Sequence, residues 1–202
     1  QAEQDFINNQ WLREKNRGLE LESQRVGIIG FGNNGKAFAQ KLVSLGVTVL
    51  AYDKFKTGFS DGNIIESTLN EIYNEASVVS FHIPLTKETT YMADYQFFKR
   101  FRTPVYVLNI SRGKVLKTKD LIKALNEGLV IGAALDVLEE ESKSFNVKNM
   151  GEMVNGLNKR PNVIITPHVA GWSKESYFKL SNVLADKILN KKSPHKEGFS
   201  YG

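Results

Sequence analysis

The sequence predicts a doubly wound α/β fold: a mostly parallel sheet with helices on both faces. Short apolar runs alternate along the chain with helix-length segments. Each run is apolar on both sides, as strands must be when helices cover both faces of a parallel sheet. A glycine-rich turn, Gly30 to Gly35, lies between the first run and the helix that follows it. Together these three observations favour this fold class over an all-α or an all-β protein.

The strands are assigned to the apolar runs that are rich in β-branched residues. In chain order they are expected at residues 26–29, 47–52, 78–82, 105–109, 132–136 and 163–165.

The helices are assigned from apolar residues at helical spacing and from their end signals. The first is expected at 36–45, and Ser67 is expected to cap a second that runs through Tyr73. A third, at 117–126, stops before Gly128, since glycine is common just beyond a helix. Three segments lie outside the alternation: a leading helix at 2–16, a long loop with one helical turn at 143–160, and a closing amphipathic helix at 173–190.

Composition narrows the class of protein. The 202 residues, 41% hydrophobic and 24% charged, suit one globular domain at 21–190, after a leading segment at 1–20 and before a loose tail at 191–202. The net charge of +5 is spread along the chain, so no nucleic-acid partner is expected. The chain has no cysteine and no apolar run of membrane-spanning length, so we expect a cytoplasmic protein without membrane contact. Because the chain begins with Gln1, we expect it to be a portion of something longer.

The glycine-rich turn reads Gly30-Phe31-Gly32-Asn33-Asn34-Gly35, the Rossmann-type fingerprint Gly-x-Gly-x-x-Gly between a strand and a helix. Its first glycine permits the tight turn, the second admits a pyrophosphate, and the third lets helix and strand pack closely. Asp53 ends the next strand at the spacing expected for an acid that binds the ribose 2′-hydroxyl, which favours NAD over NADP. Lys54 and Lys56 could soften the repulsion of a 2′-phosphate, and a solvated turn residue is the alternative for Asp53.

Three residues further on suggest hydride transfer at a carbonyl carbon. Arg112 offers a planar fork for a substrate carboxylate, and His168 can exchange a proton with the carbonyl oxygen. Glu141 would keep that imidazole charged. Each residue also has a reading without chemistry: a surface ion pair for Arg112, a solvated side chain for Glu141 and a strand end for His168. Taken together, however, Arg112, Asp136 and His168 each end or follow a predicted strand. Ligands of such sheets bind at the carboxyl ends of the strands.

Five ordered segments resemble the NAD-binding domain of the D-isomer-specific 2-hydroxyacid dehydrogenases, the family of phosphoglycerate, glycerate and D-lactate dehydrogenases. The resemblance runs from about Trp11 to about Asn190. It rests on Val-Gly-Ile-Ile-Gly-Phe-Gly-Asn-Asn-Gly (26–35), Val-Val-Ser-Phe-His-Ile-Pro-Leu-Thr (78–86), Leu-Asn-Ile-Ser-Arg-Gly (108–113), Gly-Ala-Ala-Leu-Asp-Val-Leu (132–138) and Thr-Pro-His-Val-Ala-Gly-Trp (166–172).

The resemblance implies a role for each residue. Arg112 would bind the substrate carboxylate, His168 would be the acid in reduction and the base in oxidation, and Glu141, chosen over Glu139 and Glu140 by the family's spacing from Asp136, would support His168. Asp136 would hold the nicotinamide carboxamide. The other implied cofactor-binding residues are Gly30, Gly32, Asn33, Asn34, Gly35, Asp53, His82, Pro84, Asn109, Ser111 and Gly171, and no metal is expected. For His82 a structural histidine is the stronger alternative, and His195 is read as solvated.

The family also implies a partner and a missing part. Its members carry roughly one further domain, which selects the substrate, before the segment matching Trp11, and they form homodimers through this domain. The leading helix around Trp11 and the loop around Met150 are the contact candidates, although Trp11 could equally cover the core of its own domain.

The sequence departs from the family pattern at Asn34 and Ser142, and these departures concern loop geometry. The substrate would be a 2-oxo or 2-hydroxy acid. One alternative is an NAD-sensing corepressor of the same fold without turnover; a second, formate oxidation, lacks its usual glutamine in place of Glu141.

Overall fold

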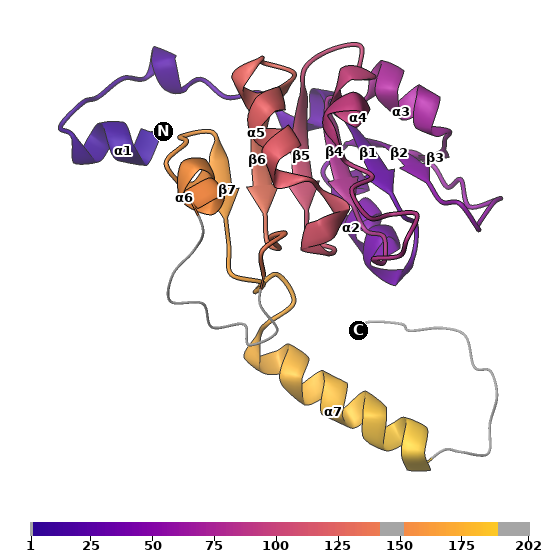
Figure 1. The fold of residues 1–202 in the computed structure, drawn as a ribbon. Coiled ribbons are helices and arrows are strands. Elements are labelled where there is room, and N and C mark those ends of the chain that lie inside the picture. Colours follow the sequence, from indigo (N-terminus) through magenta and orange to yellow (C-terminus); the bar gives the residue numbers. More distant parts are fainter. Residues whose placement is uncertain (1, 142–151, 190–202) are drawn as a thin grey trace. The chain divides into compact units, whose positions relative to one another are not determined.

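The structure is a computed structural model that describes residues 2–141 and 152–189 (Figure 1). The chain forms two compact units, Gln1–Pro167 and His168–Gly202, and each is described by itself. Residues 143–151 of the predicted loop at 143–160, the predicted tail at 191–202 and His195 lie outside the described residues.

The first unit is built on a seven-stranded sheet in which every strand pair is parallel. The strand order β3-β2-β1-β4-β5-β6-β7 is that of a doubly wound sheet, so the predicted fold class is confirmed. All strands therefore end at one edge of the sheet, which is where a ligand would bind. The strands are β1 (Arg25–Ile29), β2 (Thr48–Tyr52), β3 (Ile64–Glu66), β4 (Val78–Phe81), β5 (Val105–Asn109), β6 (Val130–Leu135) and β7 (Val163–Ile165).

Helices connect the strands. In the first unit they are α1 (Ala2–Ile7), α2 (Asn33–Val43), α3 (Leu69–Glu75), α4 (Tyr95–Lys99), α5 (Thr118–Asn126) and α6 (Glu152–Asn158), with short 3₁₀ turns at Glu14–Asn16, Leu21–Ser23 and Gly113–Val115. The second unit contains α7 (Lys174–Leu189), which has no buried residue. No helix of the described ranges is both long and apolar enough to cross a membrane.

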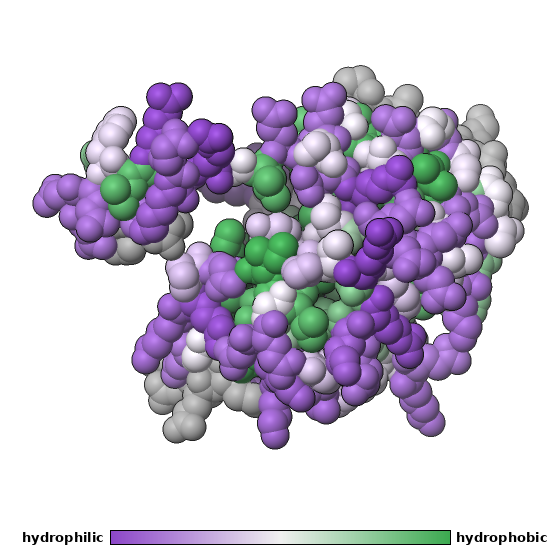
Figure 2. Space-filling view, turned by 90° about the horizontal axis from the view of Figure 1, so that it is seen from above, coloured by the Kyte–Doolittle hydropathy of each residue, from purple (hydrophilic) through white to green (hydrophobic). Residues whose placement is uncertain are grey.

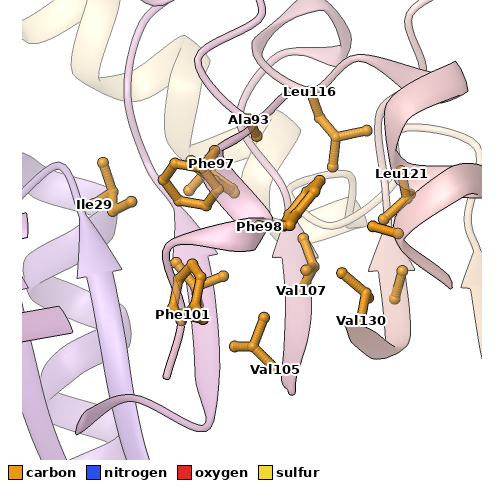
Figure 3. Close-up of a cluster of buried hydrophobic side chains, with 14 of the residues drawn as sticks. Ile29, Ala93, Phe97, Phe98, Phe101, Val105, Val107, Leu116, Leu121 and Val130 are labelled. Carbon is orange, nitrogen blue, oxygen red and sulfur yellow. The ribbon is translucent and has the colours of Figure 1, made fainter. Parts of the chain in front are cut away.

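The sheet separates two hydrophobic clusters. On one face, α2 packs Ala39 and Leu42 against β1, β2 and β3. On the other face, α3, α4, α5 and α6 contribute to a larger cluster. Figure 3 shows its centre, where Phe98 of α4 lies next to Val107 of β5. The chain buries the apolar runs of β1, β2 and β4 on both sides of the sheet, which is why these strands lack an alternating pattern.

One half of the α2 face is less covered than the other. Strand register places Leu108 beside Ala134, and Ala134 beside Ile164, on the face to which Ile28 contributes. Ile164 is 66% exposed and Tyr106 is 36% exposed. Figure 2 shows one face of the molecule, on which hydrophobic residues gather near the middle of a mainly hydrophilic surface.

Several predicted boundaries are corrected. The cap of α3 is Thr68, not Ser67: Thr68 Oγ1 accepts the N–H of Glu71 at 3.2 Å and the Glu71 carboxylate accepts the N–H of Thr68 at 2.6 Å. The leading helix ends at Ile7 instead of 16, because Asn9 adopts a φ of 56° and the chain turns. Lys15 and Asn16 then fold back onto Asp5 at 3.0 and 3.1 Å. The strand β3 and the helix α4 were not predicted.

Candidate active site

The glycine turn is packed closely against the protein at Gly30 and Gly35. Gly30 has a φ of 97°, a conformation that favours glycine, and its N–H donates to the carbonyl of Tyr52 at 2.8 Å. A Cβ on Gly35 would lie 2.0 Å from the carbonyl oxygen of Gly30, so only glycine lets α2 begin against the turn. A Cβ on Gly32 would meet nothing within 4 Å. The turn is therefore packed on the protein side and open on the other, where a phosphate could approach.

The first turn of α2 faces the same opening. Asn33 and Asn34, both exposed, are its first two residues, with Gly32 as the N-cap. The first N–H groups of a helix have no partner within it and attract anions. These two residues thus lie where the sequence places a pyrophosphate.

Asp53 directly follows β2 and contacts the turn. Its Oδ2 accepts the N–H of Phe31 at 2.8 Å. Its Oδ1 accepts the N–H groups of Phe55 and Lys56 at 2.9 and 3.1 Å. The structure thus brings the predicted acid and the predicted glycine turn together at the end of neighbouring strands.

His82 directly follows β4 and lies under the turn. Its Nε2 is 2.9 Å from Ser80 Oγ, and its ring lies 5.2 Å from the ring of Phe38. Burial lowers the pKa of His82 to about 4, so the ring is neutral at neutral pH. Its Nδ1 is buried without a hydrogen-bond partner among the described residues. This geometry suits the structural alternative, with the ring supporting the turn. Pro84 is exposed two residues further on, where its carbonyl accepts the Thr89 hydroxyl at 2.7 Å.

Arg112 lies on a tight loop at the end of β5. Asn109 is fully buried and organises the loop: its Oδ1 accepts the N–H and hydroxyl of Ser111 at 3.1 and 2.8 Å, and its Nδ2 donates to the carbonyl of Arg112 at 3.1 Å. The side chain of Arg112 is exposed and uses Nη1 to bind the carbonyl of Ser111 at 2.7 Å. The guanidinium is thus exposed on an ordered loop, and its planar fork suits the recognition of a carboxylate.

The loop that carries Glu141 packs against the Arg112 loop. A Cβ on Gly113 would lie 1.8 Å from the carbonyl oxygen of Leu138, so glycine after Arg112 is what allows this contact. Glu141 itself is exposed, and its N–H donates to Leu138 at 3.2 Å.

Glu139 is tied into the structure. Its Oε1 accepts the hydroxyl of Tyr91 at 2.7 Å and its Oε2 accepts the N–H of Thr118 at 2.9 Å. Burial raises the pKa of Glu139, but the hydrogen bonds from Thr118 and Tyr91 and the charge of Lys114 outweigh it, so the net shift is downward. Of the three consecutive glutamates, Glu139 therefore has a structural role. The choice of Glu141 for the chemistry stays a prediction.

Asp136 joins the ends of three strands. It is buried, its N–H donates to the carbonyl of Asn109 at 3.0 Å, and its Oδ1 accepts the hydroxyl of Thr166 at 2.5 Å. Its position is at the same sheet edge as the glycine turn and the Arg112 loop.

His168 and Gly171 belong to the second unit. His168 is its first residue and has a φ of 55°, an uncommon conformation for a residue other than glycine. The first unit brings together the glycine turn, Asp53, Arg112, Asp136 and the Glu141 loop at one sheet edge. The pairing of His168 with Glu141 stays a prediction. Within the described ranges no cluster of residues could hold a metal ion.

Sequence reasoning missed the supports of this site. Tyr91 and Gly113 were given no role, and Glu139 was considered only as a rival to Glu141. For Gly113, its position directly after Arg112 was a signal in the sequence. For Tyr91 and Glu139 there was none, because their hydrogen bond joins residues 48 positions apart.

Known proteins resemble this chain in sequence. The sequence model described as "D-isomer specific 2-hydroxyacid dehydrogenase, NAD binding domain" matches residues 1–170. The D-lactate/D-glycerate dehydrogenase of Pediococcus acidilactici is 33% identical over 91% of this chain and 58% of that protein. The glyoxylate reductase of Thermofilum pendens is 31% identical over 94% of this chain and 56% of that protein.

Solved structures of the same family are also similar to this chain. The crystal structure of a D-lactate dehydrogenase with NAD⁺ from Lactobacillus jensenii gives a TM-score of 0.84 at 28% identity, covering 93% of this chain and 58% of that one. An NAD-complexed D-isomer specific 2-hydroxyacid dehydrogenase from Lactobacillus delbrueckii ssp. bulgaricus also gives 0.84, at 30% identity, covering 96% and 62%. The chain thus spans less than two thirds of each of these proteins.

Proposed function

Because the chain belongs to the D-isomer-specific 2-hydroxyacid dehydrogenase family, as its NAD-binding domain, we propose that it binds NAD and carries the catalytic residues of such an enzyme. The reaction is reversible hydride transfer between the cofactor and a 2-hydroxy or 2-oxo acid. One observation supports this most strongly: the glycine turn, bonded to Asp53, shares a sheet edge with Arg112 and Asp136.

Each residue has a distinct task in this proposal. The dinucleotide, when bound, supplies or accepts the hydride. The open side of Gly32 and the first turn of α2 hold its pyrophosphate, and Asp53 accepts a ribose hydroxyl. Asp136 orients the carboxamide. The remaining proposed contacts are Asn33, Asn34, Pro84, Ser111 and Gly171.

The substrate is held and protonated by other residues. Arg112 binds the substrate carboxylate in its fork and so fixes the carbonyl carbon. His168 donates a proton to the carbonyl oxygen during reduction and removes it during oxidation, supported by Glu141.

We propose that residues 21–190 act together with a separate substrate domain in the whole protein, since the relatives are longer than this chain. The chain alone is then expected to bind NAD but to turn over slowly, because water is not excluded and the substrate is not clamped. The named relatives are dehydrogenases and a reductase, and they give the corepressor alternative no support.

A homodimer through this domain is also proposed. Trp11 is 83% exposed and Phe6 is 65% exposed, and the half-covered sheet face adds Ile164. Exposed apolar groups of this size favour a contact with another chain. The second contact candidate, Met150, lies outside the described residues. Sedimentation at high protein concentration is expected to show a dimer, and a monomer throughout would contradict it.

Isothermal titration calorimetry with NAD tests the function. We expect saturable heat with the wild-type chain and none with Gly32→Asp, which adds a negative charge where the pyrophosphate lies without a clash in the protein. Absence of binding by the wild-type chain at millimolar NAD would refute the proposal.

A further inference from the structure

The loop after Asp53 is held against the glycine turn at both ends. At its start, Asp53 accepts the N–H of Phe31 at 2.8 Å. At its end, the ring of Phe59 stacks on that of Phe31 with centroids 4.3 Å apart. Glu66 accepts the N–H of Phe59 at 3.2 Å and so fixes the same end. Side chains on residues 54–58 therefore extend from a backbone with a defined position beside the turn.

Two lysines on this loop differ in their partners. Lys54 forms an ion pair with Glu88, which compensates its charge. Lys56 Nζ instead donates to the carbonyl oxygen of Phe31 at 3.0 Å, a neutral partner inside the glycine turn. Within the described part of the chain, Lys56 forms no ion pair. The ammonium of Lys56 is thus held at the turn with its charge uncompensated.

Most hydrogen-bond acceptor sites of the neighbouring acid, Asp53, are already used. Asp53 accepts three backbone N–H groups, from Phe31, Phe55 and Lys56. A carboxylate has about four acceptor sites, so about one is left for a ribose hydroxyl. The three N–H dipoles also reduce the negative potential at Asp53. The usual repulsion between this acid and a 2′-phosphate is therefore weakened here.

We propose that Lys56 forms a subsite for the 2′-phosphate of NADP, so that the chain accepts NADP as well as NAD. The inference rests on the proposed dinucleotide site. A 2′-phosphate brings about two negative charges at neutral pH, and Lys56 is the cation positioned to meet them. NAD has no such group and needs only the free acceptor of Asp53. Lys56 is thus a specificity-determining residue and not a general phosphate ligand.

The test compares NAD with NADP, which differ only in the 2′-phosphate, by calorimetry on wild type, Lys56→Gln and the matched control Lys54→Gln. Wild type is expected to bind NADP within about tenfold of its NAD affinity. Lys56→Gln should weaken NADP about fivefold, the upper end for an exposed ion pair, and leave NAD unchanged. Lys54→Gln should leave the ratio of the two affinities unchanged, and Lys56→Arg should restore it. Added salt should reduce the effect of Lys56.

The outcomes separate the two proposals. If NAD binds but Lys56→Gln leaves the ratio unchanged, the subsite is overturned while the proposed function stands. An equal loss of NAD and NADP in Lys56→Gln also overturns it, because Lys56 would then serve a part common to both. If neither dinucleotide binds to the wild type, the proposed function fails and the subsite with it.

Discussion

The buried His82 makes the stability of the protein depend on pH in a calculable way. Its pKa is about 4 in the folded protein against an ordinary 6.5, and burial is the cause. As the pH falls below 6.5 the unfolded chain takes up a proton here and the folded protein does not, until the pH approaches 4. The state that binds more protons is stabilised as the pH falls. Here that is the unfolded state, so this histidine destabilises the fold on acidification. Above pH 6.5 this destabilisation fades toward zero.

The size follows from the two pKa values. Linkage gives a destabilisation of about 0.2 kcal/mol at pH 7 and about 2 kcal/mol at pH 5. The substitution His82→Gln removes the titration but leaves an amide that can bond to Ser80, which lies 2.9 Å from Nε2 in the wild type. Every other titrating group is common to both proteins. The difference in unfolding free energy between them should therefore shift by about 2 kcal/mol between pH 7 and pH 5, in favour of the variant.

Urea unfolding followed by far-ultraviolet circular dichroism is the assay. The tryptophans are poor reporters, because Trp11 and Trp172 are 83% and 70% exposed. Proton NMR gives a direct check: the chain has three histidines, and the resonance missing from His82→Gln should titrate near pH 4. Equal pH dependence in the two proteins, or a His82 resonance that titrates near 6.5, would refute the reasoning.

Three further predictions follow from the packing. Gly35→Ala should both destabilise the fold by about 1–3 kcal/mol and abolish NAD binding, because its Cβ would lie 2.0 Å from the carbonyl oxygen of Gly30. Gly32→Ala, whose Cβ meets nothing within 4 Å, should leave the melting temperature unchanged. A similar loss of stability in both variants would contradict the packing argument. Thr68→Ala should cost about 1 kcal/mol in urea unfolding through loss of the helix cap, more than Ser67→Ala does; the reverse order would restore Ser67 as the cap. Tyr91→Phe and Glu139→Gln should be less destabilising together than the sum of the single variants, in a double-mutant cycle by thermal unfolding, because they share one hydrogen bond; strict additivity would mean that this bond contributes nothing.

Strands buried on both faces, such as β1 and β4, could be predicted because a short unbroken apolar run is typical of a strand that helices cover on both sides. The missed strand β3 has only two apolar residues, Ile64 and Ile65, before Glu66, whereas β7, also three residues long, is apolar throughout and was predicted. The missed helix α4 has five residues, too few to show helical spacing. It forms because Asp94 caps it at 2.8 Å from the N–H of Phe97, and Phe97 and Phe98 are buried.

The candidate site also has a part that could be predicted from the sequence and a part that could not. Arg112 and Asp136 could be placed at one sheet edge because each follows a strand, and parallel strands end together. The bond from Tyr91 to Glu139 could not be predicted, since it depends on tertiary packing between distant segments. The same holds for Lys56, whose contact with Phe31 depends on how the loop folds back.

The strand order also has a kinetic consequence. Every neighbouring pair in the sheet joins consecutive strands of the chain except β1 and β4. Local pairing can therefore build two sub-assemblies, β1 to β3 and β4 to β7, before they meet, because closing short loops costs less entropy than closing long ones. Gly27 lies in the seam between them, where a Cβ would be 2.6 Å from the side chain of Ile72. A bulkier residue at Gly27 would meet Ile72 at this seam, so we expect it to slow the meeting of the two sub-assemblies.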